Sequence, residues 1–309
     1  MLVRPEKVQD YAAIAAVQMR AFNQRPSEAM VVALHRQRPE FDPDLSLIAE
    51  IDGEIVGHIL LSPYKVIMFR QEVWAVLLAP IAVDPDYQGE GIGSRLVEAG
   101  HRIARLKGYS FSMLLGYPDY YSRLGYLPRA FGTTKVTVAT QDLPPSDLIA
   151  RPLQEGDIPA LYQLWEESEG AVDFALNPGT QLLDWISPNP LIGSTVFTNA
   201  EGEVVGYTRS HAIERYKPRV FLAQDNAVAR SMVAHIFETE ETDITEVILP
   251  LHPKSAAAAP DFGITSCELW EVAMVYPLLP SQFEIYYNQV AAGSRLPGRP
   301  IWPTAFDLD

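Results

Sequence analysis

The sequence predicts an α/β fold, more closely an α+β mixed sheet with helices on both faces, built twice along the chain. Three observations lead to this prediction. Strand-like and helix-like stretches alternate, a glycine-rich turn joins a long strand to a helix, and the second half repeats features of the first. The 309 residues are 48% hydrophobic and 20% charged, which is typical of a globular protein with a full core.

The first elements are a short strand, a helix and a hairpin. Apolar residues at helical spacing, Ile14, Val17 and Phe22, predict the helix. Two β-rich stretches, 46–51 and 54–61, flank Asp52-Gly53, and this dipeptide strongly favours a tight hairpin turn.

A long strand is expected over 73–83, although it contains Pro80. Proline has no N–H to donate to a neighbouring strand, so Pro80 should mark a bulge or an edge. A helix over 91–106 follows, with Leu96, Ile103 and Leu106 on one face, and Gly108 ends it. Then come a buried strand, a short helix and a closing strand, at "FSMLL" (111–115), "DYYSRL" (119–124) and "TTKVTVA" (133–139).

The second half resembles the first. "VRPEKVQDYAAIAAVQ" from Val3 matches "ARPLQEGDIPALYQLW" from Ala150, and "DGEIVGHILLS" at 52–62 matches "EGEVVGYTRSH" at 201–211. "RLGY" at 123–126 is a weaker match to "DFGI" at 261–264. Two copies of one plan are therefore expected. We place domains at 1–140 and 148–309, joined by a linker that holds Pro144-Pro145.

Charge and cysteine content restrict the function classes. A formal net charge of −15 argues against nucleic-acid binding; it favours cationic substrates or simply keeps the surface soluble. The single cysteine, Cys267, excludes an internal disulfide, suits a reducing cytoplasm and should lie buried in a strand. The N-terminal stretch has the pattern of neither a signal peptide nor a membrane span. The six histidines show no metal-ligand spacing, so no metal site is expected.

The glycine turn "QGEGIG" at 88–93 has more glycine than a simple turn needs. Its spacing is not the G-x-G-x-x-G of a dinucleotide fold, and it lacks the lysine of a phosphate-binding P-loop. The remaining interpretations are a tight turn, or bare amides at a helix N-terminus that bind an anion such as a diphosphate.

The stretch also resembles a known family. "QGEGIG" fits the Gln/Arg-x-x-Gly-x-Gly/Ala signature of the GNAT N-acetyltransferases, and the likeness continues through "YYSRLGY" at 120–126. It is strong over 74–129, fair over 2–61 and weak in the second copy. The resemblance implies a GNAT fold, an acyltransferase and acetyl-CoA as co-substrate. It implies that the diphosphate is bound by Gln88, Gly89, Glu90, Gly91, Ile92, Gly93 and Ser94.

Further contacts follow from the same resemblance. Arg95 either adds charge against the phosphates or lies on a solvated helix face. The family's fourth and fifth strands diverge and hold pantetheine between them, which assigns backbone contacts to Ile81, Ala82 and Val83. The Ile81 amide would then polarise the acetyl carbonyl, where negative charge develops in the transition state.

The catalytic residues implied are Tyr121 and Ile81. Tyr121 either protonates the leaving sulfur or is an aromatic packing residue among its tyrosine neighbours. The base is unassigned, because Leu77 occupies the position of the family's glutamate; water or Glu50 are candidates. The family's asparagine before its fourth helix is replaced by "GYPDY", which weakens the case for cofactor contacts over 117–119.

The second copy has no glycine in the corresponding stretch, "QDNAVARS" at 224–231, and has Ala259 where the first has Tyr121. It is expected to be a degenerate copy that stabilises the first and walls its acceptor site. Its acidic runs, "EESEG" at 166–170 and "ETEETD" at 238–243, either face solvent or present acid to a cation.

The expected function is acetyl transfer from acetyl-CoA to a primary amine of a small molecule, by direct attack in a ternary complex. A protein amine or a longer acyl group would be a close variant, and a homodimer is left open. The alternative from another class is a non-catalytic sensor that binds acyl-CoA. Mycothiol-synthase-like proteins also use tandem units, but with a better preserved second copy.

Overall fold

The computed structural model describes residues 1–141, 143, 145–239 and 244–308. Five strands of the first half and one strand of the second half form a six-stranded sheet. The strand order is β1-β2-β3-β4-β5-β13, and only the β4–β5 pair is parallel. This is the mixed sheet that the sequence predicts. The strands are β1 (Leu2–Pro5), β2 (Ser46–Ile51), β3 (Glu54–Met68), β4 (Gln71–Val83), β5 (Phe111–Leu115) and β13 (Ala273–Pro277).

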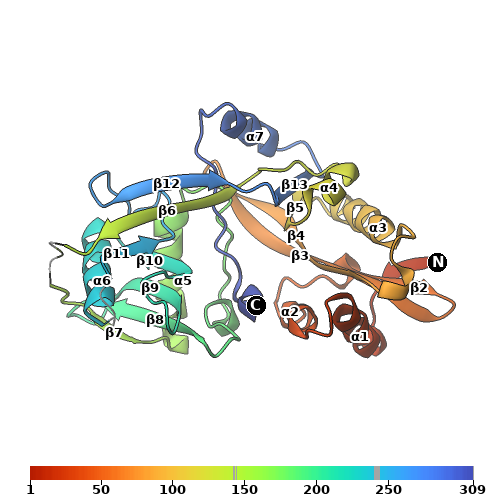
Figure 1. The fold of residues 1–309 in the computed structure, drawn as a ribbon, viewed down its shortest axis with the longest axis horizontal. Helices are drawn as coiled ribbons and strands as arrows, with labels where there is room; N and C mark the ends of the chain where they lie inside the picture. Colours follow the sequence, from red (N-terminus) through yellow and green to blue (C-terminus); the bar gives the residue numbers. More distant parts are fainter. Residues whose placement is uncertain (142, 144, 240–243, 309) are drawn as a thin grey trace.

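Helices cover both faces of this sheet, with α1 and α2 on one side and α3 and α4 on the other (Figure 1). On α3, Leu96 and Val97 are buried against the sheet, but Leu106 is 83% exposed and the prediction for it is wrong. The sequence indicates more than one helix after the first strand, but it did not assign residues to α2. The bounds are α1 (Tyr11–Ala21), α2 (Ser27–His35), α3 (Ile92–Leu106) and α4 (Pro118–Tyr121).

Two local predictions in this sheet are confirmed. Asp52 and Gly53 form the turn between β2 and β3 with φ values of 50° and 85°, a left-handed pair typical of tight hairpins. In β4 the register against β3 shifts so that Ala79 and Pro80 together lie opposite Leu60. Pro80 therefore lies in a β-bulge, where one strand has an extra residue and bends.

The strand β6 (Gly132–Ala139) was expected to close the first sheet, but it does not. It pairs on both edges with strands from the second half, β11 (Glu246–Leu249) and β12 (Ile264–Leu269). In return, β13 from the second half hydrogen-bonds to β5 in the first sheet. The two halves thus exchange strands. The domain boundaries 1–140 and 148–309 stay a prediction.

The second half contains a four-stranded antiparallel sheet in the order β10-β9-β8-β7. Leu161 and Trp165 of α5 pack on one face, whereas Met232 and Val233 of α6 pack on the other. The strands are β7 (Ile149–Pro152), β8 (Ile192–Thr198), β9 (Val204–His211) and β10 (Val220–Ala223). The helices are α5 (Ile158–Glu169), α6 (Asn226–Thr239) and α7 (Phe283–Ala291).

The glycine-poor start of α6 follows Gln224 and Asp225, where the first half has its glycine turn. Cys267 lies on β12, as expected for a strand, but it is exposed rather than buried. The linker residues 142 and 144 and part of the acidic run, 240–243, lie outside the described residues. No helix in the described ranges is both long and apolar enough to cross a membrane.

The C-terminal segment, residues 295–308, runs back between the two halves (Figure 1). Arg299 forms a buried ion pair with Glu169 of α5 at 2.9 Å. Asp173 accepts hydrogen bonds from Arg295 at 2.5 Å and from the backbone N–H of Phe69, in the β3–β4 turn, at 2.9 Å. These contacts fix the segment to both halves of the molecule.

Three buried histidines make stability depend on pH. Burial lowers the pKa of His35, His101 and His252 to about 4. In the unfolded chain these side chains regain ordinary values near 6.5, so the unfolded state binds more protons between about pH 6.5 and 4. The free energy of unfolding should therefore fall by roughly 1–2 kcal/mol per histidine between pH 7 and pH 5. Urea unfolding at both pH values measures this. Equal stabilities would contradict the burial of these histidines in the neutral form.

The strand exchange predicts that residues 1–140 do not fold alone. This fragment lacks β13, so β5 becomes an unpaired edge and Phe111 and Met113 lose the cover of Val275 and Phe283. We expect no cooperative unfolding transition by circular dichroism. A fusion that adds residues 270–292 through a flexible linker should restore the transition. A fragment 1–140 as stable as the full chain would contradict this account.

Candidate functional site

The candidate site begins where β4 and β5 separate. The two strands pair only at Val76 with Ser112 and at Leu77 with Met113. Beyond these pairs, β4 continues to Val83 beside β3 alone, while β5 ends at Leu115 beside β13. The backbone groups of β4 that point away from β3 in this stretch are left without a strand partner, and they are available to an extended ligand.

The glycine turn lies between the end of β4 and the start of α3. Gly89 and Gly91 have φ values of 84° and 79°, so both occupy left-handed conformations that glycine adopts at little cost. Within the described chain, the backbone N–H groups of residues 89–94 donate to no acceptor. The side chain of Gln88 donates to the carbonyl of Val83 at 3.0 Å and holds the turn against the strand.

Gly93 is needed for space and not for conformation. A Cβ at this position would lie 2.8 Å from the Tyr120 hydroxyl and 3.9 Å from the Ile81 side chain. Gly93 thus lets the first turn of α3 approach both the β4 strand and the α4 region. At Gly89 and Gly91, in contrast, an added Cβ meets nothing within 4 Å, so their surroundings are open.

The structure places the predicted site residues in two groups. Residues 88–95 surround the N-terminus of α3, where Ile92 is buried, Gly93 and Ser94 are half-buried and Arg95 is exposed. Ile81 and Tyr121 line a cavity at the separation of β4 and β5, whereas Ala82 is buried and Val83 is partly buried beside them. The turn lies at one end of the strand segment and the cavity at the other.

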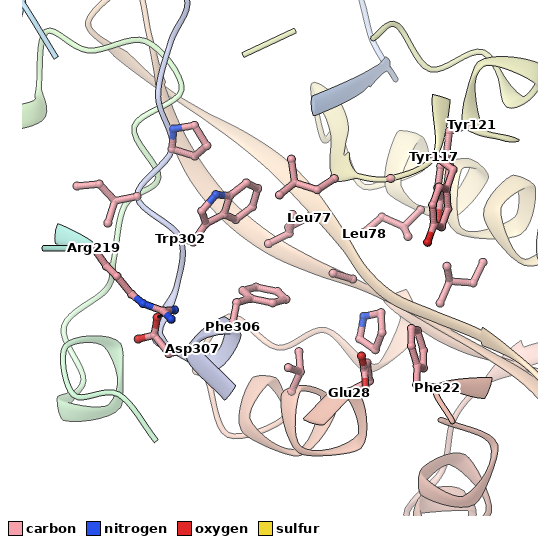
Figure 2. A pocket seen from close by; sticks show the side chains of 18 of the residues that line it. Phe22, Glu28, Leu77, Leu78, Tyr117, Tyr121, Arg219, Trp302, Phe306 and Asp307 are labelled. Atoms are coloured by element: carbon pink, nitrogen blue, oxygen red, sulfur yellow. Dashed lines mark hydrogen bonds and ion pairs between the residues drawn. The ribbon is translucent and has the colours of Figure 1, made fainter. Parts of the chain in front are cut away.

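That cavity has a volume of about 790 Å³ and receives residues from both halves of the chain (Figure 2). The first half contributes β4, the loop after β5, Tyr121 and two helices, α1 through its C-cap Phe22 and α2 through Glu28 and Val31. The second half contributes Arg209, Arg219 and the C-terminal segment. From that segment come Pro300, Ile301, Trp302, Phe306 and Asp307.

Tyr121 reaches this cavity from α4. It is 8% exposed and packs edge-on against Tyr120 and Tyr126, with ring centroids 4.9 and 5.5 Å away. Burial raises the pKa of Tyr121 above its ordinary value, and the neighbouring Tyr120 raises it further. The phenol is therefore protonated at neutral pH and can donate a proton into the cavity. Tyr126, in contrast, is bound to Ser112 at 2.7 Å and His101 at 2.8 Å.

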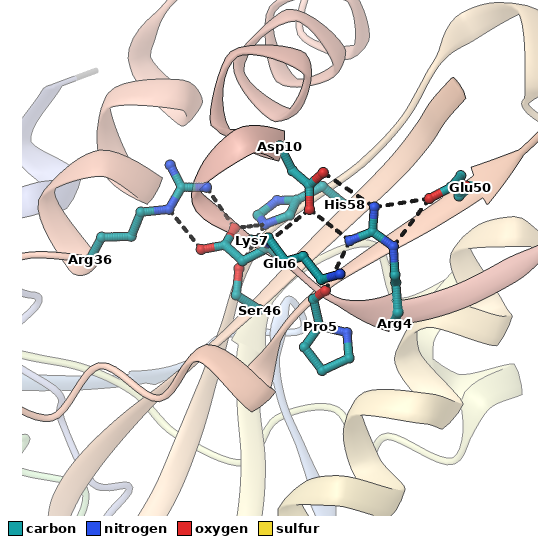
Figure 3. Close-up of polar contacts among 9 residues, drawn as sticks. All are labelled: Arg4, Pro5, Glu6, Lys7, Asp10, Arg36, Ser46, Glu50 and His58. Atoms are coloured by element: carbon teal, nitrogen blue, oxygen red, sulfur yellow. Dashed lines mark hydrogen bonds and ion pairs between the residues drawn. The ribbon is translucent and has the colours of Figure 1, made fainter. Parts of the chain in front are cut away.

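Glu50, a candidate base from the sequence, lies elsewhere. It accepts hydrogen bonds from Arg4 at 2.9 and 3.1 Å in a cluster near the N-terminus (Figure 3). Arg4 also binds Asp10 at 2.7 Å, and Arg151 binds Asp157 at 2.7 Å in the second half. The Arg–Asp pair of this cluster therefore occurs in both halves of the chain. Glu50 does not line the cavity.

The same cluster holds a buried glutamate. Burial favours the neutral acid of Glu6, but hydrogen bonds from His58, Arg36 and Ser46 outweigh it and lower the pKa of Glu6 to about 2. Arg36 donates to it at 2.6 and 2.8 Å (Figure 3). The carboxylate of Glu6 is fully paired, so its role is to stabilise the fold.

Sequence reasoning missed the carboxylates that do line the cavity. Glu28 lies on α2, whose residues the sequence did not assign, and Asp307 lies at the far end of the chain. Asp307 forms ion pairs with Arg209 at 3.1 Å and Arg219 at 3.2 Å. No sequence pattern links positions 28 and 307 to a site that is centred on residues 78–121, so only the fold brings them together.

Comparison with known proteins agrees with this geometry. A family model described as an acetyltransferase (GNAT) domain matches residues 3–129. An uncharacterized N-acetyltransferase of Escherichia coli K12, YjhQ, is 40% identical over 124 residues, which is 39% of this chain and 66% of that protein. A second, YhbS of the same strain, is 34% identical over 127 residues, 41% of this chain and 73% of its own length.

A crystal structure from Enterococcus faecalis V583, described as a probable N-acyltransferase of unknown function, extends the likeness to both halves. It covers 90% of this chain and 72% of its own, with a TM-score of 0.68 and 14% identity. This likeness shows the shared fold. The chain belongs to the GNAT acetyltransferase family.

The turn makes a first functional prediction, for Gly93→Ala. The new Cβ displaces the Tyr120 hydroxyl, a movable side-chain end, so the stability should change by less than about 1 kcal/mol. The displaced ring and the methyl group narrow the approach to the amides of residues 92–94, and coenzyme A should bind about tenfold more weakly. Calorimetric titration measures this. Gly156→Ala, where a Cβ meets nothing within 4 Å, is the matched control. Unchanged affinity of Gly93→Ala for coenzyme A would mean that the ligand does not approach the amides of residues 92–94.

Proposed function

We propose that the protein transfers an acetyl group from acetyl-CoA to a primary amine of a small molecule, by direct attack in a ternary complex. One observation carries the proposal: the open strand segment 78–83 connects the bare amides at the start of α3 to the cavity that contains Tyr121. Family membership supports acetyl-CoA as the co-substrate and acyl transfer as the reaction.

Acetyl-CoA would lie along this path. The N–H groups of residues 89–94 and the positive end of the α3 dipole bind its diphosphate, with Arg95 at the rim. The pantetheine chain pairs with the unpartnered side of β4 at Ile81, Ala82 and Val83. The thioester then reaches the cavity at Ile81, whose backbone N–H stabilises the oxyanion that develops on the acetyl carbonyl.

The reaction needs one proton removed and one supplied. An acceptor that arrives as an ammonium ion first loses one proton to water. The neutral amine then forms the C–N bond and loses a further proton to water, while the C–S bond breaks and the thiolate leaves. Tyr121 donates its proton to that sulfur, because burial keeps the phenol protonated until a stronger base forms beside it. The second half of the chain forms the opposite wall of the acceptor cavity.

Tyr121→Phe tests the acid role. The variant keeps the packing against Tyr120 and Tyr126 but has no proton to donate, so kcat should fall about 100-fold while the Kd for acetyl-CoA stays within twofold. Thiol release and calorimetry measure the two quantities. Tyr109→Phe, at a half-buried tyrosine outside the cavity, is the control. Unchanged kcat would remove Tyr121 from the mechanism.

The same assay separates an enzyme from a sensor. Wild-type protein that binds acetyl-CoA but releases no thiol with any of a broad panel of amines would reject the proposed transfer reaction. In that case the alternative, a non-catalytic acyl-CoA sensor, would explain the intact turn.

A further inference from the structure

We infer that the acceptor is a cationic amine attached to an apolar, ring-bearing body, and that Glu28 binds its ammonium group. The inference rests on the proposed function, because that function identifies the cavity as the acceptor site. It adds the chemical class of the acceptor and a residue that selects it.

The first argument is the composition of the cavity wall. Most of its side chains are apolar, and aromatic rings come from opposite sides, with Phe22 on one side and Trp302 and Phe306 on the other (Figure 2). The β4 residues Leu77 and Leu78 lie between these sides. A sugar or polyamine with many polar groups would lose hydrogen bonds to water here and regain few from the protein, whereas an apolar ring loses nothing.

The second argument is charge. Four lining residues carry charge, and three of them already pair with one another, since Asp307 is shared between Arg209 and Arg219. Glu28 is different: among the residues that the structure describes, no basic nitrogen lies within 4.0 Å of its carboxylate oxygens. Its carboxylate accepts one hydrogen bond, from the Ser27 hydroxyl at 3.1 Å. The free carboxylate therefore suits an external cation.

The two arguments together describe an amphipathic ligand. A carboxylate next to apolar surface is stabilised by an ammonium group more than it would be in open water, because the local dielectric constant is lower. The cavity volume of about 790 Å³ is far more than an ammonium group needs and accommodates a body of drug-like size. The amine would lie at Glu28 and the rings against Trp302 and Phe306.

The experiment compares ligands that differ in one group. Calorimetry on the CoA-saturated protein uses 2-phenylethylamine, its neutral analogue 2-phenylethanol, phenylalanine with an added carboxylate, and glucosamine as a polar amine. We expect the amine to bind about ten- to a hundredfold more tightly than the alcohol, as a charge-assisted hydrogen bond implies. In Glu28→Gln this preference should fall to about twofold. Glu98→Gln, at an exposed glutamate on α3 outside the cavity, should keep it.

Each other result overturns the inference. If phenylalanine binds more tightly than the amine, Arg219 recognises an anionic ligand and the assigned class is wrong. If glucosamine binds more tightly, the apolar body is not selected. If Glu28→Gln weakens the amine and the alcohol equally, Glu28 only supports the cavity wall. A thermal melt of the variant excludes simple unfolding, because a half-buried surface glutamate should be replaceable without loss of the fold.

Thiol release separates this inference from the proposed function. Amine binding that depends on Glu28, without release of CoA from acetyl-CoA, would reject the transfer reaction and still support the ligand class. Release of CoA with glucosamine but not with 2-phenylethylamine would support the transfer reaction and reject the ligand class.

Discussion

The site depends on the early end of pairing between β4 and β5. A sheet normally satisfies backbone groups by adding a neighbouring strand, and here the pairing stops after Leu77 while β4 continues to Val83. The bulge at Ala79 and Pro80 bends β4 at this point. The same bend exposes the strand to the cavity, and in the proposed function the gap beside it takes the extended cofactor chain. Loss of the separation would remove both of the proposed ligand sites together.

The second half of the chain takes part in the site although it lacks a glycine turn of its own. Its C-terminal segment is held by the buried pair of Arg299 with Glu169 and by Asp173, which also binds the β3–β4 turn. The rings of Trp302 and Phe306 are thereby fixed opposite β4. The exchange of β6 and β13 keeps the two halves in one arrangement, so the acceptor cavity has walls of defined geometry.

The glycine turn at the start of α3 could be predicted from the sequence, but the wall of the cavity could not. Bare amides need glycine, so Gly89, Gly91 and Gly93 leave a local pattern, as does the hairpin at Asp52-Gly53. The acceptor wall is made by single side chains far apart in sequence, such as Glu28 and Trp302, and no local pattern marks them. Strand exchange was missed for the same reason, because β6 has a strand pattern whichever sheet it joins.

The contrast between backbone groups at the turn and side chains at the cavity wall also suggests how binding of the two substrates is divided. In the proposed reaction, backbone groups bind the part that does not vary, the diphosphate and thioester, so their geometry depends on the fold and little on side chains. In the same proposal, side chains from both halves of the chain surround the part that varies, the acceptor. Glu28 on α2 and the C-terminal rings can therefore change without disturbing the turn or the β4 bulge. If the proposed function holds, substitutions in this wall would change the acceptor and leave the acyl donor the same.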